Sequence, residues 1–92
     1  MSTELLIQPD FNLTASNSDK LKQQLSEAIH SGKKNIVIDL DGVEIIDSTG
    51  LSVLIFAHNR VKNVHPLVLQ NVSDDIKRLL SITRLDKYFE IG

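Results

Sequence analysis

The segment from Asn35 to Leu51 constrains the fold most, because it joins a short apolar run to a helical repeat through a polar turn. Residues 36–40 are almost continuously apolar, which is typical of a strand buried on both faces. Beyond the turn Asp47-Ser48-Thr49-Gly50, apolar residues recur at helical spacing and predict a helix over about residues 49–63. This segment therefore predicts a strand, a turn and a helix in succession.

Strand and helix patterns alternate on both sides of this segment. We expect strands over residues 4–8, 35–40 and 67–71, and a last short strand near residues 88–91. We also expect two more helices. One has a capping-box-like start at Ser16 and Asp19 and a stop at Gly32, and the other begins after a Ser73 cap. The alternation predicts an α/β sandwich, in which helices pack on a small mixed sheet of about four strands.

Size and composition exclude several classes of protein. Ninety-two residues suit one domain over residues 1–92, and a net charge of −2 provides no broad basic surface for nucleic acid. Without cysteine the chain has neither disulfides nor thiolate metal sites, and we expect no metal and no cofactor. Residues 1–4 lack the features of a signal peptide, and no apolar run approaches about 18 residues. We expect a soluble cytoplasmic protein without membrane insertion.

The hydroxyl of Ser48 is expected at the start of the helix that follows the turn, where Asp47 or Ser48 is the N-cap. Unpaired N–H groups and the helix dipole at this end would favour a phosphoryl group on Ser48. The structural alternative is that Ser48 serves only as a cap. Gly50 would either leave the loop open to another protein's active site or serve backbone geometry alone.

Val37-Ile-Asp-Leu followed by Val43-Glu-Ile-Ile-Asp-Ser-Thr-Gly-Leu51 resembles the signature of the STAS domain, the family of bacterial anti-sigma factor antagonists. The similarity continues through Leu69–Ser73 and covers about residues 5–91. It implies a STAS-like sandwich, with Ser48 as the phosphorylation site and Thr49 as the second choice. One departure is that family members usually begin with an additional strand and a Gly-Glu-Leu-Asp-like turn. Pro9-Asp10-Phe11-Asn12 stands here instead, so we expect a truncated N-terminal strand.

The resemblance implies partner switching in transcription regulation. The unmodified protein would bind a serine-protein-kinase-type anti-sigma factor, which would phosphorylate Ser48 and let go, and a serine phosphatase would reset the switch. We expect a monomer when the protein is free. The expected partner-binding surface comprises the Ser48 loop and the first helical turns: Asp47, Ser48, Thr49, Gly50, Leu51, Val53 and Phe56.

The predicted helix after Ser48 is apolar around most of its circumference. Val53, Phe56 and Ala57 lie partly off the stripe that would face the sheet. They either fill space beside a neighbouring helix or form an exposed docking patch, since exposed apolar patches commonly mark interfaces.

Other functions stay open on the sequence alone. A STAS domain could serve signalling without a sigma factor, or act as a scaffold, for example in a lipid-transport complex. Asp39 and Asp41 also resemble the first motif of haloacid-dehalogenase phosphatases, but the later Mg²⁺-holding carboxylates of that chemistry are not evident. Ser48 as a hydrolase nucleophile would need one of three histidines and lacks the Gly-x-Ser-x-Gly elbow. The histidines are His30, His58 and His65. We expect no enzymatic activity.

Overall fold

The computed structural model describes residues 4–32 and 35–91 of the chain. Residues 1–3, 33, 34 and 92, which include both ends of the predicted domain, lie outside the described residues. The elements in chain order are β1 (Glu4–Ile7), α1 (Ser18–His30), β2 (Asn35–Asp39), α2 (Ser48–Val61), β3 (Val68–Gln70), α3 (Asp74–Ile82), the 3-10 helix η1 (Leu85–Lys87) and β4 (Glu90–Ile91).

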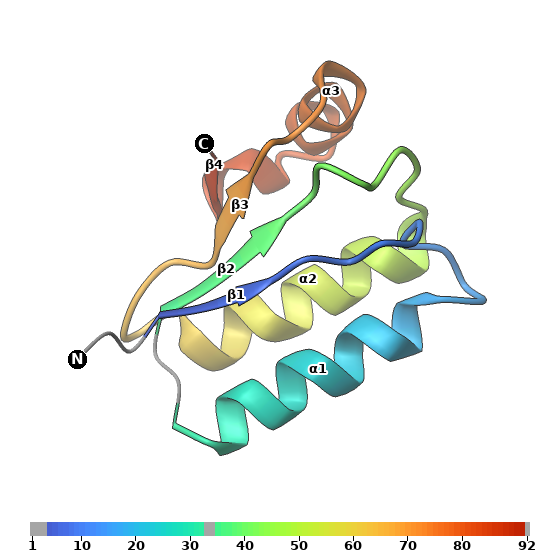
Figure 1. The fold of residues 1–92 in the computed structure, drawn as a ribbon. Coiled ribbons are helices and arrows are strands. Elements are labelled where there is room, and N and C mark those ends of the chain that lie inside the picture. The colour runs from blue at the N-terminus through green and yellow to red at the C-terminus, as the bar shows by residue number, and fades with distance from the viewer. Residues whose placement is uncertain (1–3, 33–34, 92) are drawn as a thin grey trace.

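The strands form one four-stranded sheet in the order β1-β2-β3-β4 (Figure 1). All three pairings of adjacent strands are parallel, and Ile38 lies between Ile7 and Leu69 in the register. This confirms the α/β sandwich with a four-stranded sheet, but the mixed strand direction that we predicted is wrong. Each connection between consecutive strands contains a helix, which carries the chain back to the same end of the sheet and makes neighbouring strands parallel.

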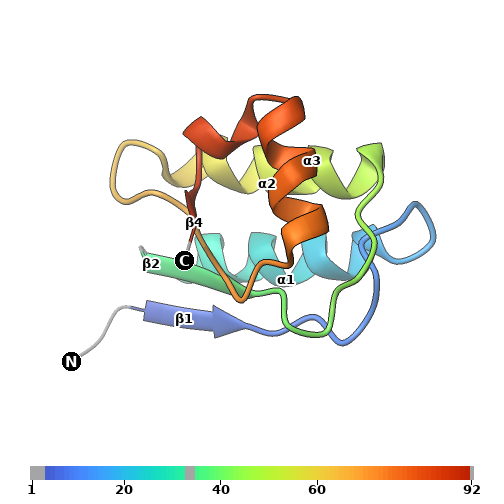
Figure 2. The same cartoon turned by 90° about the horizontal axis from the view of Figure 1, so that it is seen from above.

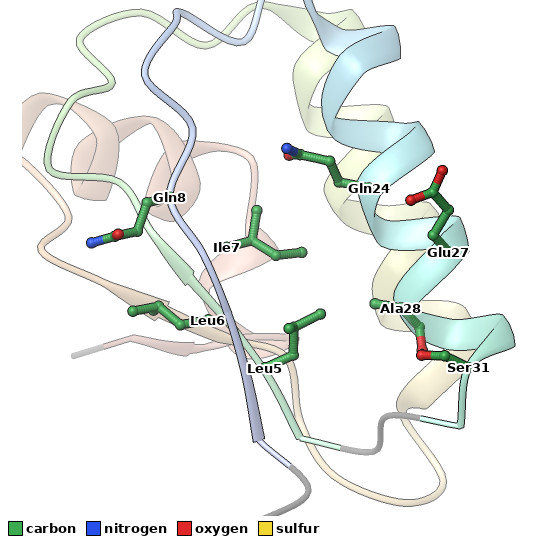
Figure 3. A pocket seen from close by; sticks show the side chains of 8 residues that line it. All are labelled: Leu5, Leu6, Ile7, Gln8, Gln24, Glu27, Ala28 and Ser31. Carbon is green, nitrogen blue, oxygen red and sulfur yellow. The ribbon is translucent and has the colours of Figure 1, made fainter.

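One apolar core joins the sheet to the helices. Ile36, Val37 and Ile38 of β2 are 1%, 3% and 0% exposed, which confirms that the central strand is buried on both faces. Helices α1 and α2 lie side by side along the sheet, whereas α3 crosses their direction (Figures 1 and 2). Figure 3 shows a hollow between β1 and α1, in which Leu5 and Ile7 point toward α1 while Leu6 and Gln8 point away.

The helix ends match the sequence signals at three of four predicted positions. Gly32 has a φ of 84°, the left-handed conformation that ends α1, and the Ser73 hydroxyl accepts the Ile76 N–H at 3.2 Å to cap α3. Asp47 caps α2. The cap predicted at Ser16 is wrong, because Asn17 precedes α1 and makes no side-chain cap hydrogen bond. The Thr14 carbonyl instead accepts the amide N–H groups of Asn17 and Ser18, at 2.9 and 2.7 Å.

Candidate functional site

Ser48 is the first residue of α2, and its side chain is exposed. The residue before it, Asp47, has an extended backbone, and its Oδ1 atom accepts the Gly50 N–H at 3.0 Å. Asp47 is therefore the N-cap, one of the two residues that the sequence allowed. The cap fixes the position at which the Ser48 hydroxyl leaves the helix.

A second segment, residues 11–17, packs along the Ser48 loop and holds it in place. The other carboxylate oxygen of Asp47 accepts the Ala15 N–H at 2.9 Å. The Leu13 carbonyl accepts the Asp47 N–H at 3.1 Å, and the Leu13 N–H donates to the Ile45 carbonyl at 3.0 Å. Leu13 and Ile46 thus form an isolated parallel bridge. The Ile45 carbonyl and both the N–H and the side chain of Asp47 are thus tied to residues more than 30 positions earlier in the chain.

Asn12, which was not among the predicted site residues, also joins these two segments. Its Oδ1 atom accepts the N–H groups of Glu44 and Ile45, at 2.9 and 3.2 Å. Asn12 ends the segment that stands in place of the family's Gly-Glu-Leu-Asp-like turn. Asparagine and aspartate both present an acceptor oxygen at the same distance from the backbone. The match of Asn12 to the last residue of that turn is the signal that could have identified it.

Gly50 is buried against the same segment. A Cβ atom added to Gly50 would overlap the Leu13 carbonyl oxygen and lie 2.8 Å from the Leu13 Cβ. A contact this close permits only glycine, even though the residue is helical. Of the two roles that the sequence suggested, the geometry supports close backbone packing, because Gly50 is not on an open surface.

The expected partner-binding residues divide by exposure. Ser48 and Thr49 are exposed, and Asp47, Leu51 and Phe56 are partly exposed. Val53 is 5% and Ala57 0% exposed, and both belong to the apolar core, so they fill space inside the molecule and offer no docking patch. Ile45, three residues before Ser48, is 55% exposed and adds an apolar surface residue to the predicted set.

The charge next to Ser48 is set by Asp47. The hydrogen bond from the Gly50 N–H stabilises the carboxylate and lowers the pKa of Asp47 below its ordinary value, despite some opposing desolvation. The group is therefore ionised at neutral pH. The Ser48 hydroxyl thus lies beside a fixed negative charge at the positive end of a helix dipole.

Asp39 is held by neighbouring amides at the carboxyl ends of three strands. It accepts hydrogen bonds from the Asn71 side chain at 2.9 Å, the Gln8 side chain at 3.1 Å and the Asp41 N–H at 3.0 Å. These bonds, that of Asn71 foremost, lower the pKa of Asp39. No group of three or more histidine, aspartate or glutamate side chains in residues 4–32 and 35–91 is arranged to hold a metal. Through its bonds to Gln8 and Asn71, Asp39 ties together the ends of β1, β2 and β3, and Asp41 contributes only a backbone N–H.

The histidines have other neighbours than Ser48. The Nδ1 atoms of His30 and His65 hydrogen-bond the carbonyl oxygens of Ser26 and Pro66, at 2.7 and 2.8 Å. The His58 ring packs against two aromatic rings, those of Tyr88 and Phe89. Within the described part of the chain, none of the three makes a hydrogen bond to the Ser48 hydroxyl.

No described helix is long and apolar enough to cross a bilayer.

Comparison with protein families gives a match to the STAS domain over residues 2–92. Among solved structures, a candidate anti-sigma factor antagonist from Thermotoga maritima superposes with a TM-score of 0.90 at 24% identity, over 99% of this chain and 80% of that one. The anti-sigma factor antagonist SpoIIAA in its unphosphorylated form gives a TM-score of 0.78 at 16% identity, over 97% and 79% of the two chains.

A structure of the Bacillus cell fate determinant SpoIIAA in the phosphorylated form is also similar. Its TM-score is 0.74 at 16% identity, over 100% of this chain and 85% of that one. At these identities the likeness shows the α/β fold alone.

Proposed function

The chain belongs to the STAS domain family, and we propose that it is a phosphorylation-controlled partner-switching regulator of the anti-sigma factor antagonist type. The unmodified protein binds a serine-kinase-type anti-sigma factor, and the sigma factor held by that partner is released. The partner then phosphorylates Ser48 and dissociates, and a serine phosphatase restores the hydroxyl. In this cycle the protein is a substrate and a ligand, without catalysis of its own, and it is a monomer when free.

The observation that carries this proposal is an exposed serine on a rigid loop. Ser48 is exposed, whereas the residues around it are fixed by bonds from Asp47, Asn12 and Leu13. A kinase active site must position an acceptor hydroxyl closely, and a preorganised loop lowers the entropy lost when it binds. This arrangement suits a hydroxyl that a folded partner recognises in one geometry.

Phosphorylation would change the charge of this loop without displacing its backbone. The Ser48 oxygen attacks the γ-phosphorus of ATP, ADP leaves, and the hydroxyl proton passes to a base of the partner. The product carries about −1.5 to −2 charges beside the ionised Asp47. The phosphate lies at the amino end of α2, where the helix dipole favours an anion. The fold therefore tolerates the modification, while an acidic partner surface is repelled.

The contact surface that we propose contains only residues that are exposed or partly exposed. It consists of Ile45, Asp47, Ser48, Thr49, Leu51 and Phe56. Gly50 and Val53 support this surface from below, because both are buried. Ile45 and Leu51 supply the apolar contacts on either side of the hydroxyl.

The test is incubation with the cognate serine kinase and ATP, followed by mass mapping of the phosphate. We expect phosphate on Ser48 in the wild type and in Thr49→Ala, and none in Ser48→Ala. Ser48→Ala should still bind the kinase, and Ser48→Asp should bind more weakly. Phosphate found only at other residues would contradict the proposal. Co-purification with membrane transport proteins in the absence of any kinase would favour a scaffold role, in which Ser48 is structural.

A further inference from the structure

Two hollows that share Phe56 lie between α1 and α2, and the first of them reaches Thr49, the residue after Ser48. The first hollow is lined by Asp19 and Lys22 of α1 and by Thr49, Ser52 and Phe56 of α2, with the buried Val53 at its base. The second hollow continues past Phe56 to Ile29, His30 and Arg60. We call these two hollows together the α1–α2 groove. Thr49 belongs both to this groove and to the contact surface around Ser48, so the two surfaces are continuous.

The middle of the groove is positively charged. The Lys22 ammonium lies 5.2 Å and the Arg60 guanidinium 5.1 Å from the centroid of the Phe56 ring. Both cations are exposed, and among the described residues neither forms an ion pair with a carboxylate. The ring holds each cation in place by a cation–π contact. Two cations thus contact the same ring, on a chain whose net charge is −2.

From this arrangement we infer that the α1–α2 groove binds an acidic segment of the same partner that recognises Ser48. Carboxylates of this segment would form charge-assisted hydrogen bonds to Lys22 and to Arg60, and the partner's apolar side chains would cover the Phe56 edge. The inference rests on the proposed function, because the groove extends the surface that presents Ser48. It goes beyond that function by specifying the partner's charge and the second place of contact.

The groove would also couple binding to phosphorylation. Asp19 is the acidic residue that lines the end of the groove near Ser48, and a phosphate on Ser48 would add further negative charge at that end. An acidic segment seated on Lys22 and Arg60 would be repelled there, whereas the unmodified hydroxyl has no such effect. The same acidic segment therefore binds the unmodified protein and leaves the phosphorylated one.

The experiment is a titration of the Ser48 kinase into three proteins: the wild type, Lys22→Glu/Arg60→Glu, and the control Lys77→Glu/Arg78→Glu. The control makes the same change of charge at exposed positions on α3. We expect the groove variant to bind at least about tenfold more weakly and the control to bind like the wild type. The wild-type affinity should fall as salt is added, and that of the groove variant should fall less. Equal melting temperatures would show that all three proteins are folded.

The outcomes separate the two proposals. If the wild type binds no serine kinase, the proposed function fails and this inference fails with it. If the wild type, the control and the groove variant bind equally well, the inference alone is overturned. The same variants are also tested for self-association by sedimentation and for binding to phosphatidylserine vesicles. Loss of either property, with kinase affinity unchanged, would assign the groove to a second copy or to a lipid surface and would overturn the inference.

Discussion

At the level of single residues, Asn12 holds the Ser48 loop through one oxygen atom. Its Oδ1 accepts two backbone N–H groups, those of Glu44 and Ile45. We predict that Asn12→Ala lowers the free energy of unfolding by about 1–2 kcal/mol, because two hydrogen bonds lose their acceptor. Urea unfolding measures the loss, and hydrogen exchange should show faster exchange of these two amides.

Asn12→Asp is the matched control, since a carboxylate can accept the same two bonds. It should retain the slow exchange of the Glu44 and Ile45 amides. If Asn12→Ala is as stable as the wild type and exchanges these amides no faster, Asn12 does not hold the loop.

Gly50 gives a second prediction, and its sign distinguishes packing from helix propensity. In an ordinary helix interior, alanine is more favourable than glycine by about 1 kcal/mol. Here the added methyl would overlap the Leu13 carbonyl oxygen, so Gly50→Ala should destabilise the protein by about 1–3 kcal/mol. Chemical denaturation checks the direction, with Asn59→Ala, an exposed position of the same helix, as the control. A Gly50→Ala variant more stable than the wild type would refute the close contact.

At the level of elements, the start of α2 should respond to acid. The Gly50 N–H holds the pKa of Asp47 below its ordinary value of 3.8, so the carboxylate stabilises the folded state above that value. As the pH falls through the lowered folded pKa, this contribution is lost, because the unfolded chain takes up the proton more readily.

We predict that the melting temperature of Asp47→Asn falls less steeply than that of the wild type as the pH is lowered below about 4. Asp39, whose pKa is also lowered, should account for part of the remaining slope. Melting curves recorded from neutral pH to about pH 2 measure the two slopes. Parallel curves would mean that Asp47 gains no stabilisation from its hydrogen bonds.

The sequence predicted the positions of the helices and strands well, but it predicted the direction of strand pairing less well. The structure confirms four predictions that each depend on a few neighbouring residues. These are the apolar run of β2, the Ser73 cap, the stop at Gly32 and a cap at Asp47 or Ser48, of which Asp47 is the observed one. The cap at Ser16 was wrong because backbone bonds to the Thr14 carbonyl replaced it. The mixed strand direction was wrong, because each connection between consecutive strands contains a helix and all three strand pairs are parallel.

At the level of the domain, the sequence predicted Ser48 at the start of a helix, but it did not predict that residues 11–17 pack against the Ser48 loop. The bonds from Ala15 to Asp47 and from Glu44 to Asn12 each span 32 residues. Periodicity and capping rules use neighbouring positions, so they carry no information on contacts at this separation. For the same reason the burial of Val53 and the contact of Lys22 with Phe56 could not be predicted, because both depend on the packing of α1 against α2.

Residues 11–17, which hold the Ser48 loop, make the domain a rigid support for one hydroxyl, and the α1–α2 groove extends the surface around it. Ser48 is the exposed point of this support, and Asp47 beside it is already charged. In the proposed switch the backbone does not need to move, because phosphorylation would change the charge at a fixed position. The partner's affinity, and not the fold of this protein, is what phosphorylation should change.

Isothermal titration of the Ser48 kinase with the unmodified protein and with the Ser48-phosphorylated protein compares these two states. Circular dichroism of both forms should coincide, because the phosphate lies at the exposed start of α2. The account predicts that phosphorylation weakens binding by at least about tenfold, through repulsion of like charges. Equal affinity of the two forms for the kinase would contradict it.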